Sequence, residues 1–301
     1  MGYFIGIKIK KYRRIYGTID LNSSDKRKEA AEYFIKKGRK CVEDLILEYE
    51  GFIDKGFVEK EIFAKMKLEG DLHELALKIL NYQYEPKMRY GTLILIKNAK
   101  VIENDGIMKK IEDISKSDTS YENRIVAYDV LCEKLKERSL NSLLQGLMYD
   151  SHRNVRMNCI AELIELGVKN ERIVENIRHI LERENEEREV IEMLIEWCGE
   201  LKVGEFSGRL IEFLDNQDDR LSSGAAKALT RICNGDALGL IREKCLIGHD
   251  ERYRQSILED LRNKEDITKA INLVEWYRAE YPDEEEKVLP ILVDLYKRRG
   301  G

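Results

Sequence analysis

The chain has 301 residues, of which 36% are charged and 43% hydrophobic, with only three prolines and a formal net charge of −5. This composition favours helices over strands or disorder. Residues 1–40 hold 12 Lys and Arg against 4 Asp and Glu, whereas the other 261 residues hold 40 against 53, and such an acidic body argues against tight general nucleic-acid binding but leaves room for a local basic groove.

Residues 1–21 form a basic N-terminal arm ahead of the helical pattern. Its first seven, mostly apolar residues precede five cations: Lys8, Lys10, Lys11, Arg13 and Arg14. Seven residues are too few to cross a bilayer, which takes about 20, and no signal-peptide pattern follows them. Two interpretations stay open. The arm packs on the first helices as a strand or irregular segment, or it is a membrane-proximal segment whose cations contact an anionic surface.

From residue 22 to the end, the pattern is helical. Apolar residues recur at spacings of three and four, as in Val155, Cys159, Ile160 and Leu163. Turn signals such as Gly and Asn-Gly interrupt the pattern every 12 to 18 residues. This predicts a lone capping helix at 23–36 and then eight helical hairpins, at 39–66, 70–98, 103–135, 137–167, 169–201, 203–234, 236–263 and 266–299.

Basic residues mark the start of every second predicted helix at separations of 29 to 35 residues. They are Arg27, Lys60, Arg89, Arg124, Arg156, Arg188, Arg220, Arg254 and Lys287. An acid stands six residues earlier in three successive copies, which are Asp118 with Arg124, Asp150 with Arg156, and Glu182 with Arg188. Arg220 falls a position or two early, so its copy is imperfect. A period near 32 residues in a helical chain predicts an α-solenoid.

The stretch "DSHRNVRMNCIAELIELG" (150–167) is the clearest copy of this unit, and it resembles a HEAT repeat, especially the short kind of phycobilin-lyase-like HEAT proteins. The resemblance implies an all-α fold, a right-handed α-α superhelix of about eight hairpins over residues 22–301. It also implies that the paired acids and bases link neighbouring repeats as a structural ladder. The physics agrees, because an acid in the turn caps free N–H groups and an Arg one turn later reaches the next unit. A row of exposed Arg that binds an anionic partner remains the alternative.

The sequence shows no motif of a known chemistry. The four His form no HExxH pattern, the six Cys form no CxxC pair, and neither a Gly-rich phosphate loop nor GxSxG is present. We therefore expect no catalytic residues, no metal site and no cofactor. The dispersed Cys residues lie mostly in apolar helical patterns, which favours buried, reduced thiols in a cytoplasmic protein.

Two aromatic segments, "NYQYEPKMRY" (81–90) and "EWYRAEYP" (275–282), place aromatic rings beside cations. Such pairs can anchor a peptide or stack on a base. The candidate partner-binding residues are Tyr82, Tyr84, Arg89, Trp276, Tyr277 and Arg278. Their helical spacing also fits ordinary core residues, so both interpretations stay open.

These patterns favour a non-catalytic scaffold that binds a protein or peptide partner through the curved inner surface of the solenoid. We expect it in the cytoplasm, in contact with the inner membrane face if the arm binds lipid. The alternative is a nucleic-acid-binding protein similar to HEAT-like DNA glycosylases, in which Trp197 and Trp276 would contact the bases. A phycobilin-lyase-like role is a weaker alternative that rests on the repeat pattern alone.

Overall fold

The computed structural model describes residues 24–49, 55–81, 83–100, 105–183, 186–232, 239, 242–247, 251–262 and 267–300. The N-terminal arm lies outside the described residues, and so do its five cations, Lys8, Lys10, Lys11, Arg13 and Arg14. Within the described residues the regular structure is helical, apart from a single parallel bridge between Lys67 and Lys100. The predicted all-α fold of stacked helical hairpins is confirmed for this part of the chain.

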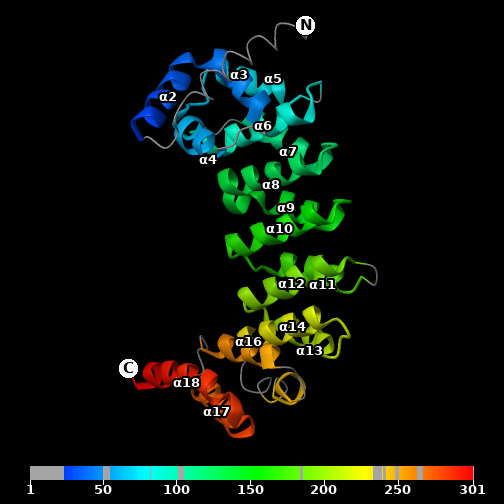
Figure 1. The fold of residues 1–301 in the computed structure, drawn as a ribbon. Helices are drawn as coiled ribbons and strands as arrows, with labels where there is room; N and C mark the ends of the chain where they lie inside the picture. Colours follow the sequence, from blue (N-terminus) through cyan, green and yellow to red (C-terminus); the bar gives the residue numbers. More distant parts are fainter. Residues whose placement is uncertain are drawn as a thin grey trace. The chain divides into compact units, whose positions relative to one another are not determined.

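The chain divides into two compact units, residues 1–162 and 163–301. In the first unit, the first helices of successive hairpins (α5, α7 and α9) contact one another in order, and the second helices α6 and α8 lie against each other (Figure 1). The helices of this unit are α2 Ser24–Lys37, α3 Arg39–Glu48, α4 Lys55–Phe57, α5 Asp71–Ile79, α6 Pro86–Asn98, α7 Asp105–Ser117, α8 Tyr121–Leu135, α9 Leu140–Tyr149 and α10 Arg153–Leu166, whose last turn belongs to the second unit.

The second unit repeats this arrangement. Its second helices α12, α14, α16 and α18 contact one another in chain order, and each first helix α11, α13 and α17 packs on the helix that completes its hairpin. The helices are α11 Glu171–Leu181, α12 Arg188–Glu200, α13 Ser207–Leu214, α14 Asp219–Ile232, α16 Glu251–Leu261, α17 Ile267–Glu280 and α18 Glu285–Gly300.

The hairpin predicted at 39–66 departs from the regular pattern. Its second helix has only three residues, Lys55–Phe57, and continues as a π-helical turn over Val58–Ile62 and a 3-10 turn over Phe63–Lys65. Gly56 in this helix weakens helical structure because it adds backbone freedom and no side-chain packing.

Each unit buries the apolar faces that the periodicity predicts. On α10, Val155, Cys159 and Ile160 are fully buried. The described free thiols Cys41, Cys132, Cys159 and Cys198 are all buried. Burial raises the pKa of the Cys159 and Cys198 thiols, which keeps them protonated and unreactive. Cys233 and the side chain of Cys245 lie outside the described residues.

The helices α3 and α6 approach closely at Gly91 in the first unit. A Cβ at this position would collide with the backbone carbonyl of Ile46 and lie 3.0 Å from its Cα. Backbone atoms cannot move aside as a flexible side chain does, so this helix crossing requires glycine. Gly208 on α13 is the opposite case, because a Cβ there would meet no atom within 4 Å.

We predict that Gly91→Ala lowers the free energy of unfolding by about 1–3 kcal/mol, because the two helices must separate. Gly208→Ala is the matched control, and we expect it to raise stability by up to about 1 kcal/mol through helix propensity. Urea unfolding followed by circular dichroism measures both values. Equal stabilities of the two variants would contradict the close approach at Gly91.

Candidate functional site

A buried ion pair joins α6 to the start of α8. Arg89 donates from Nε to Oδ2 of Asp118 at 2.5 Å and from a terminal nitrogen to Oδ1 at 3.0 Å, and the two side chains are 3% and 0% exposed. The same guanidinium donates to the carbonyl of Tyr84. Asp118 also accepts the backbone N–H of Ser120 at 2.9 Å. All charged atoms of this pair are therefore hydrogen-bonded away from water, as a buried pair requires.

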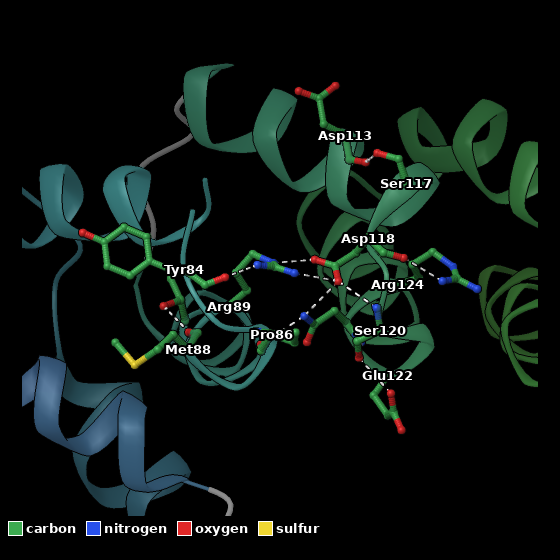
Figure 2. Close-up of polar contacts among 12 residues, drawn as sticks. Tyr84, Pro86, Met88, Arg89, Asp113, Ser117, Asp118, Ser120, Glu122 and Arg124 are labelled. Carbon is green, nitrogen blue, oxygen red and sulfur yellow. Dashed lines mark hydrogen bonds and ion pairs between the residues drawn. The ribbon is translucent and has the colours of Figure 1, made fainter. Parts of the chain in front are cut away.

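Arg124 repeats this geometry one hairpin later. Its Nε and a terminal nitrogen donate to the two carboxylate oxygens of Asp150 at 2.7 and 2.8 Å, and its other terminal nitrogen donates to the Asp118 carbonyl at 2.7 Å. The hydrogen bonds that Arg124 donates to Asp150 raise the pKa of its guanidinium. Arg156 in turn donates to the Asp150 carbonyl at 2.7 Å. Figure 2 shows Asp118 between the guanidinium groups of Arg89 and Arg124, so each acid connects two hairpins.

The second unit contains two related pairs. Arg188 contacts Asp218 at 3.3 Å, with side chains 42% and 30% exposed. Arg254 pairs with Glu284, and both side chains are nearly buried. In all four pairs the base meets an acid 26 to 30 residues later. We call these four contacts the ladder.

The ladder differs from the sequence spacing at two positions. Glu182 lies exposed at the end of α11, whereas Arg188 meets Asp218 of the next hairpin just as Arg124 meets Asp150. Asp218 accepts the backbone N–H of Arg220, just as Asp118 and Asp150 accept an N–H two residues later. Six residues after Asp218 stands Gly224, which explains why the base of that repeat appeared out of place.

A polar cluster surrounds Tyr277 near the C-terminus. Its hydroxyl donates to Glu284 at 2.5 Å and accepts from Nε of Arg254 at 2.8 Å. Gln255 donates to the same carboxylate at 3.0 Å. Burial raises the pKa of Glu284, but the hydrogen bonds from Tyr277, Arg254 and Gln255 outweigh it and hold the pKa below its ordinary value.

The structure corrects the partner-binding hypothesis for two residues. Arg89 is 3% exposed and Tyr277 is 0% exposed, and their polar atoms bond within the fold. A partner cannot reach either side chain, because each one closes a contact between helices. Trp197 is also fully buried, so it cannot stack on a base as the DNA-glycosylase alternative requires.

Two of the candidate binding residues in the second aromatic segment are accessible. Trp276 is half-buried, and the guanidinium of Arg242 lies 4.3 Å from its ring centroid. Arg278 is exposed and contacts Glu285 at 2.7 and 2.6 Å. Both positions stay candidates for partner binding.

A pocket of about 320 Å³ lies in the first unit where α6 and α8 begin. Its lining residues are Lys55, Pro86, Lys87, Tyr90, Ser120, Glu122 and Asn123. We call it the Asn123 pocket. Lys87 and Tyr90 come from the first aromatic segment, in which Tyr84 is half-buried and Tyr82 lies outside the described residues.

Asn123 is 1% exposed and has one unsatisfied oxygen. Its Nδ2 donates to the Pro86 carbonyl at 3.0 Å and to Oδ1 of Asp118 at 3.3 Å. Both partners are acceptors, so the orientation of the amide is fixed. Its Oδ1 has no hydrogen-bond partner among the described residues. A buried acceptor in this state costs about 1–3 kcal/mol.

Charged residues line the same pocket. Lys87 contacts Glu85 at 3.1 Å, and the Lys55 ammonium lies 5.5 Å from the Tyr49 ring centroid. Burial raises the pKa of Glu122, but hydrogen bonds, first among them that from Ser120, lower it overall and keep the group a carboxylate. The pocket thus combines a buried acceptor with exposed ammonium donors. The sequence analysis missed Asn123, since an Asn near a helix start is read as a turn residue.

The described residues contain neither a cluster of metal ligands nor a membrane-spanning helix. No three His, Cys, Asp or Glu side chains in this part of the chain come together as metal ligands. No described helix combines the length and the hydropathy that a membrane span needs.

Comparisons with known proteins give little. No family model matches the chain, and no curated protein matches it. A chain in the structure of the complex of CpcE and CpcF of phycocyanin lyase from Nostoc sp. PCC7120 is 15% identical, with a TM-score of 0.44 over 74% of this chain and 94% of that chain. A likeness of this degree is too low to assign a function.

We predict that Arg124→Met lowers the free energy of unfolding by about 3–5 kcal/mol, because it leaves the Asp150 carboxylate buried without its counter-charge. Arg188→Met is the matched control, and we expect a loss of about 0–1 kcal/mol, since its pair with Asp218 is largely exposed. Chemical denaturation measures both. A loss of similar size in the two variants would show that burial does not determine how much an ion pair contributes to the free energy of unfolding.

We predict that the Glu284 cluster makes stability depend on acidic pH. The pKa of Glu284 is lowered by folding, so its contribution is present above the unfolded pKa of about 4.3 and is lost as pH falls through the folded pKa. Glu284→Gln should therefore be less stable than the unchanged chain at pH 7, and the gap should narrow below about pH 4. Unfolding free energies measured from pH 7 to pH 3 test this, and a constant gap would refute it.

Proposed function

We propose that this chain is a non-catalytic HEAT-type scaffold that binds a peptide segment of a protein partner, with the Asn123 pocket as one point of contact. The observation that carries this proposal is that Asn123 lines a pocket and that its buried Oδ1 has no described hydrogen-bond partner. The repeat spacing and the ladder support the HEAT-type assignment.

The ladder supports the pocket directly. Oδ1 of Asp118 accepts from Arg89, from Ser120 and from the amide of Asn123. The pair that joins α6 to α8 therefore also fixes the Asn123 side chain. A site held in place before binding loses less conformational entropy when its ligand arrives.

The chemistry of the lining fits a peptide. A backbone N–H supplies the donor that Asn123 lacks, and a neighbouring carbonyl or acidic side chain accepts from Lys55 or Lys87. Pro86 and the half-buried ring of Tyr90 provide apolar contact on the same wall. A ligand with a donor beside an acceptor satisfies both kinds of group at once.

The other functions have less support. The DNA-glycosylase-like alternative places Trp197 against a base, and Trp197 is buried. A phycobilin-lyase-like role rests on the repeat pattern, which proteins of many functions share. Neither alternative makes use of the buried acceptor of Asn123.

We predict that the full chain selects peptides from a displayed library of random sequences, and that Lys87→Glu weakens the selected peptides at least about tenfold by removing an ammonium donor and adding a like charge beside Glu122. Lys109→Glu is the matched control, since Lys109 is an exposed lysine of the same unit on α7. Fluorescence polarisation of the labelled peptides measures the dissociation constants.

The proposal fails if no peptide is enriched, or if Lys87→Glu and Lys109→Glu bind the selected peptides equally well. A labelled oligonucleotide in the same assay separates the main alternative. Tight oligonucleotide binding that falls steeply with salt would favour a nucleic-acid role instead.

A further inference from the structure

The last helix, α18, has two apolar faces. One face is formed by Val288, Ile291, Leu292 and Leu295, which are buried. The other carries Leu289, Val293 and Tyr296, which are 39%, 47% and 45% exposed. Spacings of four and three residues place these three side chains in one row along the helix. We call this row the α18 stripe.

The contacts of α18 within the second unit show which of its faces is packed against other helices. In the second unit, α14 packs between α12 and α16, and α16 packs between α14 and α18. The helix α18 contacts α16 and α17, and the Tyr296 hydroxyl donates a hydrogen bond to Glu275 on α17. The three side chains of the stripe nevertheless keep exposed fractions of 39% to 47%. Of the five large apolar side chains exposed in the described chain, three belong to this stripe, and the others are Tyr149 and Ile247.

Charges at the two ends of α18 are opposite in sign. Acidic residues, including Glu286, occupy the first turn, and Lys297, Arg298 and Arg299 occupy the last turn. Glu286 and Arg299 are both exposed and form no ion pair with a described residue. An antiparallel helix with the same sequence would therefore meet each end of α18 with the opposite charge, and the helix dipoles would also be antiparallel.

The register of such a pair follows from the sequence. A two-fold axis that sets Leu289 opposite Tyr296 of a second copy also sets Glu286 opposite Arg299 of that copy, because both pairs are centred on the same point of the helix. Val293 then lies beside the axis. A two-fold contact requires a surface that is complementary to itself, and this helix meets the requirement in both apolar and charged residues.

We propose that the α18 stripe is a self-association surface, where two copies of this chain pair through antiparallel α18 helices. The interface is small, since one helix face supplies its core, so the dimer is weak and depends on concentration. This surface lies in the second unit and is independent of the Asn123 pocket.

Sedimentation equilibrium of the full chain over a range of concentrations tests the proposal. We expect a monomer–dimer equilibrium that Val293→Glu weakens at least about tenfold, since it brings two carboxylates together near the axis. Tyr149→Glu is the control, because Tyr149 is an exposed apolar residue away from the stripe. Circular dichroism of each variant confirms that it is folded.

A charge reversal tests the register. Glu286→Arg alone and Arg299→Glu alone should each weaken the dimer, because like charges then face each other across the axis. The double variant carrying both changes should restore it, because the opposite charges are exchanged. The proposal is overturned if the unchanged chain stays monomeric up to about 1 mM, if Val293→Glu associates as strongly as Tyr149→Glu, or if the double variant is no stronger than the single ones.

Discussion

The carboxylate of Asp118 accepts hydrogen bonds from two neighbouring hairpins. It takes two hydrogen bonds from Arg89 of the preceding hairpin and one from the backbone N–H of Ser120 at the start of α8. Its own carbonyl accepts from Arg124, which continues to Asp150 in the following hairpin. A buried charge persists only where every polar atom finds a partner. The relative placement of neighbouring hairpins in this unit is therefore fixed by hydrogen-bond geometry as well as by apolar packing.

This constraint extends to the candidate binding site. Asn123 lies one turn into α8 and bonds to Asp118, so the pair that spaces the hairpins also sets the direction of the Asn123 amide. Its nitrogen is occupied by Pro86 and Asp118, and its oxygen is left over. The Asp118 carboxylate therefore both pairs with Arg89 and orients the Asn123 amide whose oxygen has no described partner. The pair of Arg188 and Asp218 differs in this respect, because both side chains are accessible to water and impose less order.

The sequence analysis was most informative where a pattern repeats. Apolar spacing located the helical hairpins, and the recurring bases marked the start of the second helices. Glu182 was included among the ladder acids because it stands six residues before Arg188, but it lies exposed, and Arg188 pairs with Asp218 of the next hairpin. Arg220 was misaligned because the position six residues after Asp218, where other repeats carry the base, holds Gly224. Sequence spacing gives the separation of two residues along the chain, whereas an ion pair between hairpins depends on how close the two side chains lie in space.

The sequence by itself determined the helical class and the repeating hairpin, because both follow from local propensity and from the period of apolar residues. Only the tertiary structure decided which aromatic and charged residues are accessible. Arg89 and Tyr277 resembled binding residues in the sequence and proved to be buried hydrogen-bonding groups. Asn123 was not predicted as a site residue and proved to have a buried oxygen with no described hydrogen-bond partner, and the apolar side chains of the α18 stripe proved to be exposed. The physical reason is that burial and unsatisfied hydrogen bonds depend on what neighbouring helices cover, and that information is not local to any segment.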